Sequence, residues 1–106
     1  MADFKLAQKT NKQKGISNIE IQGSLTIENC DSIKKKLIEA LNNFNELNIT
    51  LKNINKIDIS VIQLFYSLNK TYNEKNKKII FGTDFSDEIS ELLKHSGLDN
   101  VFINNN

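Results

Sequence analysis

Hydrophobic and polar positions alternate in two short segments near the start of the chain. Phe4 and Leu6 stand between polar neighbours. After a connection rich in Lys, Gln and Asn, Ile19 and Ile21 show the same two-residue period, and Gly23 closes the run. This period is typical of half-buried strands, so the sequence predicts two strands of a hairpin joined by a long loop.

From Thr26 the hydrophobic period changes to three or four residues, which predicts an amphipathic helix. The apolar residues at this spacing are Ile27, Cys30, Ile33, Leu37, Leu41 and Phe44. Lys34, Lys35 and Lys36 fall mostly on the opposite side, where a solvated helix face explains them better than a nucleic-acid patch. Cys30 is the only cysteine, so it has no partner for an internal disulfide and is interpreted as a small buried hydrophobe.

Three further segments repeat the change between the two periods. Residues 47–52 alternate apolar with polar side chains, which predicts a strand with one wet face. Residues 60–73 return to the helical period, and residues 77–82 contain a continuous apolar run that predicts another, more central strand. Because helices separate these strands along the chain, we expect the strand at 47–52 to be central and parallel to its neighbour.

The last part of the chain carries the signals of a third helix and a final strand. Ser86 can accept a hydrogen bond at the helix start, and Gly97 stands where helices end in the left-handed conformation. A short strand at 101–103 precedes a polar tail at 104–106. The order β-β-α-β-α-β-α-β predicts one α/β domain over residues 1–106, with a four- to five-stranded mixed sheet and three main crossover helices. Several strands keep a polar face, so we expect the helices to cover one face more fully.

Composition and charge fit one ordinary globular domain. A chain of 106 residues can build a single core, and 39% hydrophobic and 25% charged residues argue against disorder through most of it. Every basic residue is a lysine and the formal net charge is +1, which argues against nucleic acid or an anionic membrane as a partner. The N-terminal residues lack the apolar segment of a signal peptide, so we expect a soluble, cytoplasmic protein without membrane insertion.

No set of side chains forms a convincing active site. His95 is the only histidine, and it falls in the last turn of the third helix, where it can stabilise the helix end. No other residue is spaced to bind a metal with it, and the isolated glycines form no phosphate-binding loop. Capping explains the carboxylates near predicted helix starts, which are Glu28, Asp31, Asp58, Asp84, Asp87 and Glu88. We therefore expect neither an enzyme nor a cofactor or metal site.

The second helix has an apolar side beyond the one that the core needs. At about 100° per residue, its core stripe comprises Val61, Leu64, Phe65, Leu68 and Tyr72. Ile59 falls on nearly the opposite side, beside Ile62 and Tyr66, although Ile62 stands near the edge of the stripe. Ser60 lies on the flank. Asp58 precedes the helix, where its carboxylate can accept from free helical N–H groups. Ile59 and Tyr66 are candidates for partner contact as much as for chance exposure.

Taken in order, these segments resemble a STAS domain, the module of bacterial anti-sigma factor antagonists and of sulphate transporter tails. The resemblance extends along nearly the whole chain. It rests on Gly23-Ser24-Leu25, residues 47–51, Ile57-Asp58-Ile59-Ser60, residues 78–82 and residues 92–98. In the family the second helix typically opens Asp-Ser-Ser-Gly or Asp-Thr-Ala-Gly, and a partner kinase phosphorylates the hydroxyl residue directly after Asp. Here that position holds Ile59, and the position of the Gly holds Val61.

The resemblance implies a regulatory protein-binding module whose partner is an anti-sigma factor or a serine kinase of the histidine-kinase-like ATPase type. Loops that follow parallel strands collect at one sheet edge around helix starts, so we expect the docking surface at the opening of the second helix. The expected residues are Ser24, Leu25, Asp58, Ile59, Ser60, Ile62, Tyr66, Thr83, Asp84 and Phe85. Ile59 cannot accept phosphate. Ser60 remains the candidate acceptor, but it points about 100° away, and a hydroxyl that serves the helix start explains it better.

A second class of function stays open. Some STAS domains are thought to bind small ligands or nucleotides, so the resemblance also allows a ligand-binding sensor. Competition between nucleotide and protein partner in a pulldown would separate the two classes.

Overall fold

The computed structural model describes residues 4–97 and residue 102, and its elements follow the predicted order as far as the third helix. The strands are β1 (Phe4–Asn11), β2 (Ile16–Leu25), β3 (Glu46–Ile57) and β4 (Lys78–Thr83). The helices are α1 (Ile27–Asn43), α2 (Ile59–Glu74) and α3 (Asp87–Ser96). The strand predicted at 101–103 lies outside the described residues, apart from Phe102.

The four described strands form one mixed sheet in the order β1-β2-β3-β4. β1 pairs antiparallel with β2, as the predicted hairpin requires. β3 pairs parallel with β2 on one side and with β4 on the other. The strand predicted around 47–52 is therefore interior and parallel to its neighbours, which confirms the prediction.

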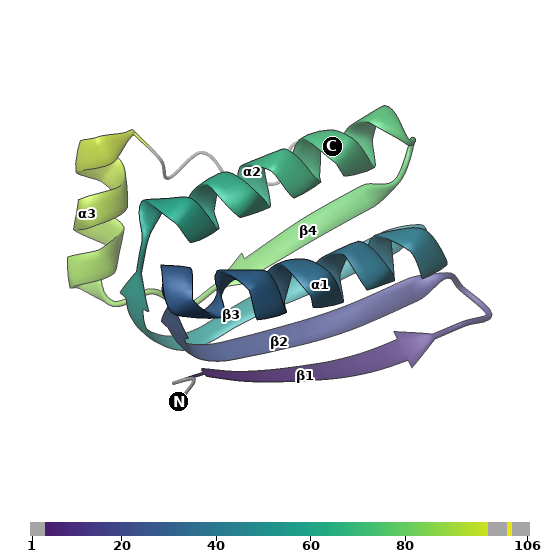
Figure 1. Ribbon diagram of the computed structural model, residues 1–106, viewed down its shortest axis with the longest axis horizontal. Coiled ribbons are helices and arrows are strands. Elements are labelled where there is room, and N and C mark those ends of the chain that lie inside the picture. Colours follow the sequence, from purple (N-terminus) through teal and green to yellow (C-terminus); the bar gives the residue numbers. More distant parts are fainter. Residues whose placement is uncertain (1–3, 98–101, 103–106) are drawn as a thin grey trace.

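The helices α1 and α2 lie side by side on the same face of the sheet (Figure 1). Each connects two adjacent parallel strands, and both connections step across the sheet in the same direction. Such crossovers are almost always right-handed, so both helices fall on one face. The opposite face carries polar side chains that bond to one another; Asn48 Nδ2, for example, donates to Asn18 Oδ1 at 3.0 Å. Helix α3 lies across one end of this layer (Figure 1).

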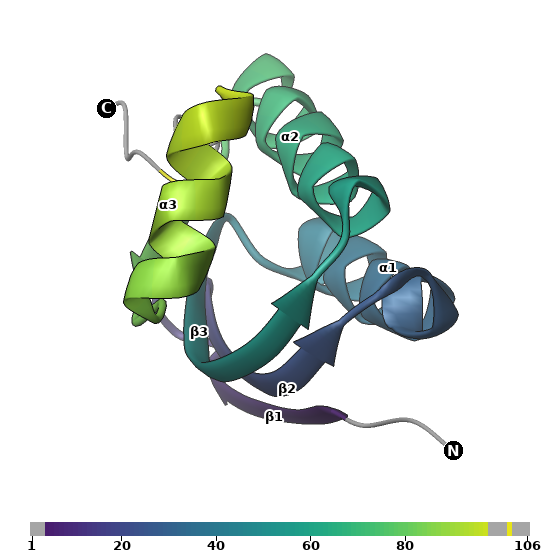
Figure 2. The same cartoon turned by 90° about the vertical axis from the view of Figure 1, so that its left-hand side faces the viewer.

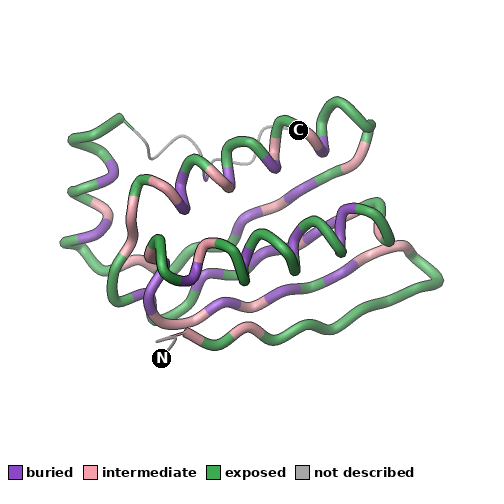
Figure 3. Tube along the Cα trace, viewed as in Figure 1, coloured by how far each residue is buried: buried purple, intermediate pink, exposed green. Residues whose placement is uncertain are grey.

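The core lies between the sheet and the two helices, where Figure 3 shows the buried positions. Alternation turns every second strand residue toward the helices. The buried strand residues include Ile19, Ile21, Leu47, Ile49, Leu51, Ile79 and Phe81. The predicted stripe of α2 is confirmed, because four of its members are buried and Leu64 is half-buried. The buried members are Val61, Phe65, Leu68 and Tyr72.

The junction between β2 and α1 differs from the expected pattern. Strand β2 continues past Gly23, where a positive φ and a register shift bend it, and ends at Leu25. Ile27, expected in the apolar stripe of the helix, is 69% exposed, and Asn29 is buried. Burial of this polar side chain is tolerated because Asn29 Nδ2 donates to the Ser24 carbonyl at 2.8 Å, so the buried donor and the carbonyl both have a hydrogen-bond partner.

Several smaller predictions about the helices are confirmed. The lysines at 34–36 are exposed as predicted, whereas Cys30, interpreted as buried, packs against the core but is only half-buried. Ser86 Oγ accepts from the Ile89 N–H at 3.3 Å at the start of α3. Gly97 ends α3 with φ +71°, a left-handed conformation that glycine adopts at little cost.

An aromatic cluster packs where α2, β4 and the segment after α3 meet. The ring centroid of Phe102 lies 5.9 Å from that of Phe65, 5.4 Å from that of Phe81 and 5.3 Å from that of Phe85. These are edge-on arrangements, which the charge distribution of aromatic rings favours. Phe102 therefore packs into the core.

Tyr72 is fully buried, and its hydroxyl has no hydrogen-bond partner among the described residues. We expect Tyr72→Phe to raise the free energy of unfolding by about 1 kcal/mol, because it removes an unsatisfied buried polar group. Burial also raises the pKa of the Tyr72 hydroxyl well above its ordinary value. Above the unfolded pKa near about 10, only the unfolded chain ionises at this residue, so the wild type should lose stability as pH rises.

Urea denaturation of both proteins at neutral pH and at about pH 10.5 measures this effect. The variant should gain more over the wild type at the higher pH. A destabilised variant at neutral pH would show that the hydroxyl is satisfied in solution.

Candidate functional site

The carboxyl ends of the three parallel strands and the first turns of the three helices meet at one end of the molecule, which faces the viewer in Figure 2. The turns into α1 and α2 are in direct contact, because the Asp58 N–H donates to the Leu25 carbonyl at 2.8 Å. Helix α3 begins on the other side of the turn into α2. The turns that follow the parallel strands therefore lie around the start of α2, as the sequence predicted.

Asp58 joins the starts of two helices instead of capping its own. Its Oδ2 accepts from the Ile27 N–H, the first of α1, at 3.0 Å. The residue occupies the N-cap position of α2, yet its side chain makes no hydrogen bond to that helix. The expectation that this carboxylate caps α2 is therefore wrong. The free N–H groups of α1 lie within reach, and the Thr26 side chain at the N-cap of α1 does not bond to them.

Exposed apolar side chains gather around this junction. Ile59 is 58% exposed and Tyr66 is 60% exposed, which confirms where helix geometry placed them. Ile27 is more exposed still, and the stripe interpretation missed it. Helix geometry could have indicated this exposure. At about 100° per residue, Ile27 lies roughly 120° around the helix from the buried Ile33, outside the buried side of α1. The bond from the Ile27 N–H to Asp58 places the backbone of Ile27 next to the residue that precedes Ile59, although the two isoleucines are far apart in the sequence.

Three residues expected on the docking surface have buried side chains, so this part of the expectation is corrected. Ser24 and Leu25 are buried because β2 continues past Gly23 and carries them into the core. Ile62 is only 3% exposed. Helix α2 packs against α1 as well as against the sheet. A helix with two packing neighbours buries a wider part of its surface than a helix with one, and this wider face includes Ile62.

The residues expected from the turn after β4 lie at the rim of this region. Thr83 and Asp84 are exposed, and the Asp84 N–H donates to the Leu51 carbonyl at 3.0 Å. Phe85 is half-buried, and its ring packs against Phe102. Thr83 and Asp84 are therefore accessible to a partner, whereas Phe85 mainly supports the core.

Ser60 does not have the role expected of it. It lies in the first turn of α2, and its Oγ is shielded from solvent. Within the part of the chain that the structure describes, this oxygen has no hydrogen-bond partner, so it does not serve the helix start. A shielded hydroxyl is also a poor phosphate acceptor, because the oxygen must reach into the active site of a kinase.

A groove of about 520 Å³ separates the turn into α2 from α3. Its lining includes Lys56, Ile57 and Asp58 on one side and Glu88, Ile89 and Leu92 on the other. Leu92 is 55% exposed, so it presents an apolar side chain at the rim. The sequence did not indicate this groove, because it depends on how α3 lies across the end of the sheet.

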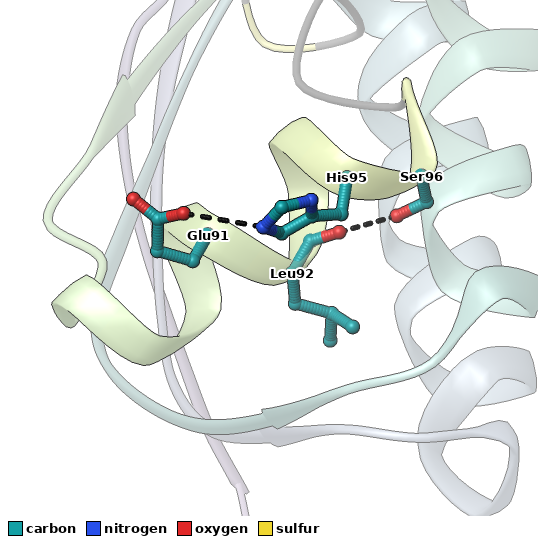
Figure 4. Close-up of polar contacts among 4 residues, drawn as sticks. All are labelled: Glu91, Leu92, His95 and Ser96. Carbon is teal, nitrogen blue, oxygen red and sulfur yellow. Dashed lines mark hydrogen bonds and ion pairs between the residues drawn. The ribbon is translucent and has the colours of Figure 1, made fainter.

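The only histidine takes part in a surface ion pair on α3. His95 Nε2 lies 3.4 Å from Glu91 Oε2, and both side chains are exposed (Figure 4). Ser96 Oγ donates to the Leu92 carbonyl one turn earlier. The pair between residues four apart lies in the last turns of α3, where a stabilising role was expected of His95. In residues 4–97 and 102, no three His, Cys, Asp or Glu side chains are placed to hold a metal, and no helix has the length and hydrophobicity to cross a membrane.

Solved structures show the same fold at low sequence identity. The anti-sigma factor antagonist SpoIIAA in its unphosphorylated form has a TM-score of 0.69 and 16% identity, over 97% of this chain and 88% of that chain. An anti-sigma factor antagonist from Mycobacterium paratuberculosis has a TM-score of 0.71 and 10% identity, over 93% of this chain and 82% of that chain. A chain in the complex of the diguanylate cyclase SiaD with its activator SiaC from Pseudomonas aeruginosa has a TM-score of 0.58 and 14% identity, over 93% of this chain and 88% of that chain.

The sequence itself identifies the family. No match was found among curated protein sequences. The family model of the STAS domain, however, matches residues 7–106. This match includes the helix starts and the turns between strands and helices that form the candidate surface. The chain therefore belongs to the STAS domain family, as the order of its segments indicated.

Proposed function

We propose that this chain is a regulatory protein-binding module that docks a partner through the start of α2 and the adjoining start of α1. The observation that carries the proposal is that Ile27 and Ile59 are both exposed at the two helix starts that the bond from Ile27 to Asp58 joins, at one end of the molecule. Neighbouring apolar side chains that are more than half exposed are typical of a surface that a partner covers. The core does not require them, because both helices already have a buried stripe.

The similar structures favour a protein as the ligand. Two of them are anti-sigma factor antagonists, and another comes from a complex of SiaD with its activator SiaC. For this chain we propose a partner of the anti-sigma factor type, or a serine kinase of the histidine-kinase-like ATPase type. The module would act without catalysis of its own, as a single domain, in cytoplasmic signalling or transcription regulation.

We further propose that the docking surface is permanently unphosphorylated. Ile59 occupies the position where the family carries its phosphate-accepting hydroxyl, and the Oγ of the next residue, Ser60, is shielded. A phosphate there would add about −1.5 to −2 charges at pH 7 and repel a partner shaped for a neutral surface. Release of the partner would therefore need another route.

A pulldown from an extract of the source organism tests the docking surface. The bait is the wild type or Ile59→Lys, which places a charge on an exposed position and should leave the melting temperature nearly unchanged. We expect a protein that the wild type retains to be lost with Ile59→Lys. The matched control is Ile38→Lys. Ile38 is also an exposed isoleucine (38%), but it lies on α1 three turns after Ile27, away from the proposed docking surface.

Three outcomes would contradict the proposal. One is equal retention by the wild type and Ile59→Lys. Another is displacement of the retained protein by nucleotide that binds the purified chain, which would favour the ligand sensor. The third is stoichiometric phosphate on Ser60 after incubation with the retained kinase and ATP, as mapped by mass spectrometry. Phosphate that appears only in Ile59→Ser, with loss of the partner, would support the proposal.

A further inference from the structure

We propose that the partner meets this end of the molecule with a basic surface, and that one of its Lys or Arg side chains enters the groove between the turn into α2 and α3. The inference rests on the docking function proposed above and deepens it. It concerns the charge of the partner, which the exposed isoleucines do not determine.

Acidic side chains lie at the same end of the molecule as the exposed isoleucines, although the whole chain has a formal net charge of +1. Exposed carboxylates near the starts of α1 and α3 are Glu28, Asp84, Asp87 and Glu88. The N-termini of the helices offset part of this charge, by about half a unit each. Lys56 is the only lysine in the lining of the groove, and it offsets part of the charge of the two carboxylates there, Asp58 and Glu88. This end of the molecule therefore stays acidic.

Lysines concentrate at the opposite end. Lys12 and Lys14 lie in the turn between β1 and β2, and Lys75 and Lys77 lie between α2 and β4. In Figure 1 both turns are at the end of the molecule away from α3. The near-zero net charge of the chain thus hides a separation into an acidic and a basic end.

The groove suits a long cationic side chain. Ile57, Ile89 and Leu92 give it apolar walls, and Glu88 supplies a carboxylate. Glu88 and Leu92 are four residues apart on α3, so they project from the same side of the helix. A Lys or Arg can lay its methylene stem along the apolar wall and end at the carboxylate. Glu88 makes no ion pair within the described part of the chain, so its charge remains available.

A basic protein fits this surface better than other occupants. The acidic end repels nucleic acid and anionic lipid headgroups. A second copy could offer its lysine-rich end, but residues 12–14 and 75–78 there are all polar and cannot cover Ile27 and Ile59. A partner with an apolar centre and a basic rim matches both features of the surface.

Glu88→Lys tests the charge, with Glu74→Lys as its matched control. Glu74 is also exposed and lies at the far end of α2, and its replacement by Lys changes the net charge by the same amount. The association rate of the partner retained in the pulldown is measured at low and high salt. We expect Glu88→Lys to lower this rate about tenfold at low salt, Glu74→Lys to leave it within about twofold, and salt to slow the wild type.

A probe that does not depend on the natural partner is a pair of synthetic helical peptides. Both carry leucines on one face, and the other face carries lysines in one peptide and glutamates in the other. We expect the lysine peptide to shift the amide resonances of Ile27, Ile59, Glu88 and Leu92 of the full chain, and the glutamate peptide to shift none of them. Glu88→Lys should weaken the response, whereas Glu74→Lys should not.

The outcomes separate this inference from the proposed function. A partner lost with Ile59→Lys whose association is insensitive to salt and to Glu88→Lys would overturn the inference and leave the docking function intact. If the pulldown retains no protein whose binding requires Ile59, the proposed docking function is wrong. The peptide experiment then tests the preference for a basic partner independently. Equal shifts by both peptides, shifts confined to other surfaces, or self-association through this end in sedimentation would overturn the inference.

Discussion

Phe65→Ala is expected to lower the free energy of unfolding by about 3–5 kcal/mol. Phe65 is fully buried, and its ring centroid lies 5.5 Å from that of Phe81 and 5.9 Å from that of Phe102. Truncation would leave a cavity between α2 and β4 and remove both ring contacts. Domains of this size are stable by about 5–15 kcal/mol, so the variant would lose a large share of its stability. Urea denaturation measures the loss.

The next residue along the helix supplies a matched control. Tyr66 is an aromatic residue of similar size, but it is mostly exposed, so Tyr66→Ala should change the free energy of unfolding by less than about 0.5 kcal/mol. If Phe65→Ala does not fold, Phe65→Leu keeps part of the volume and should show an intermediate loss. Equal losses from Phe65→Ala and Tyr66→Ala would mean that α2 does not present this face to the core.

Asp58→Ala should lower the free energy of unfolding by about 1–2 kcal/mol, the usual cost of removing an acceptor at a helix start. The Ile27 N–H would lose its partner, and only the backbone bond from residue 58 to the Leu25 carbonyl would still join the starts of α1 and α2. The variant should also bind the partner more weakly than its stability alone explains, because the spacing of Ile27 and Ile59 relaxes. Denaturation and a binding titration on the same preparation measure both effects.

Two further variants test this interpretation of Asp58. Asp58→Asn keeps an oxygen that can accept from Ile27, so it should retain more than half of the stability. Asp31→Ala removes an exposed carboxylate of α1 and should change the stability by less than about 0.5 kcal/mol. Normal stability and binding in Asp58→Ala would show that the tie between the helices has no effect.

The candidate surface could be predicted from the sequence only where one helix decided the outcome. Ile59 and Tyr66 lie opposite the apolar stripe of α2, so helix geometry alone placed them in solvent. Ile62 stands at the edge of that stripe, and its burial depended on α1 as a second neighbour. Asp58 was assigned to the nearest helix start, whereas its acceptor bond goes to α1. The missed contacts join residues that are distant in the chain, and a local period carries no information about them.

The sequence by itself determined the order of the elements as far as the third helix, the inward side of the strands with a two-residue period and the core stripe of α2. These follow from periods of two and about 3.6 residues, which one segment expresses without its neighbours, and the STAS resemblance depends on the same order. Only the tertiary structure decided that Leu25 is buried, that the start of α1 at Ile27 bonds to Asp58 at the start of α2, and that α3 forms a groove with the turn into α2. The physical reason is that parallel strands bring three separate helix starts to one end of the sheet. What lies exposed there is set by how those starts pack against one another.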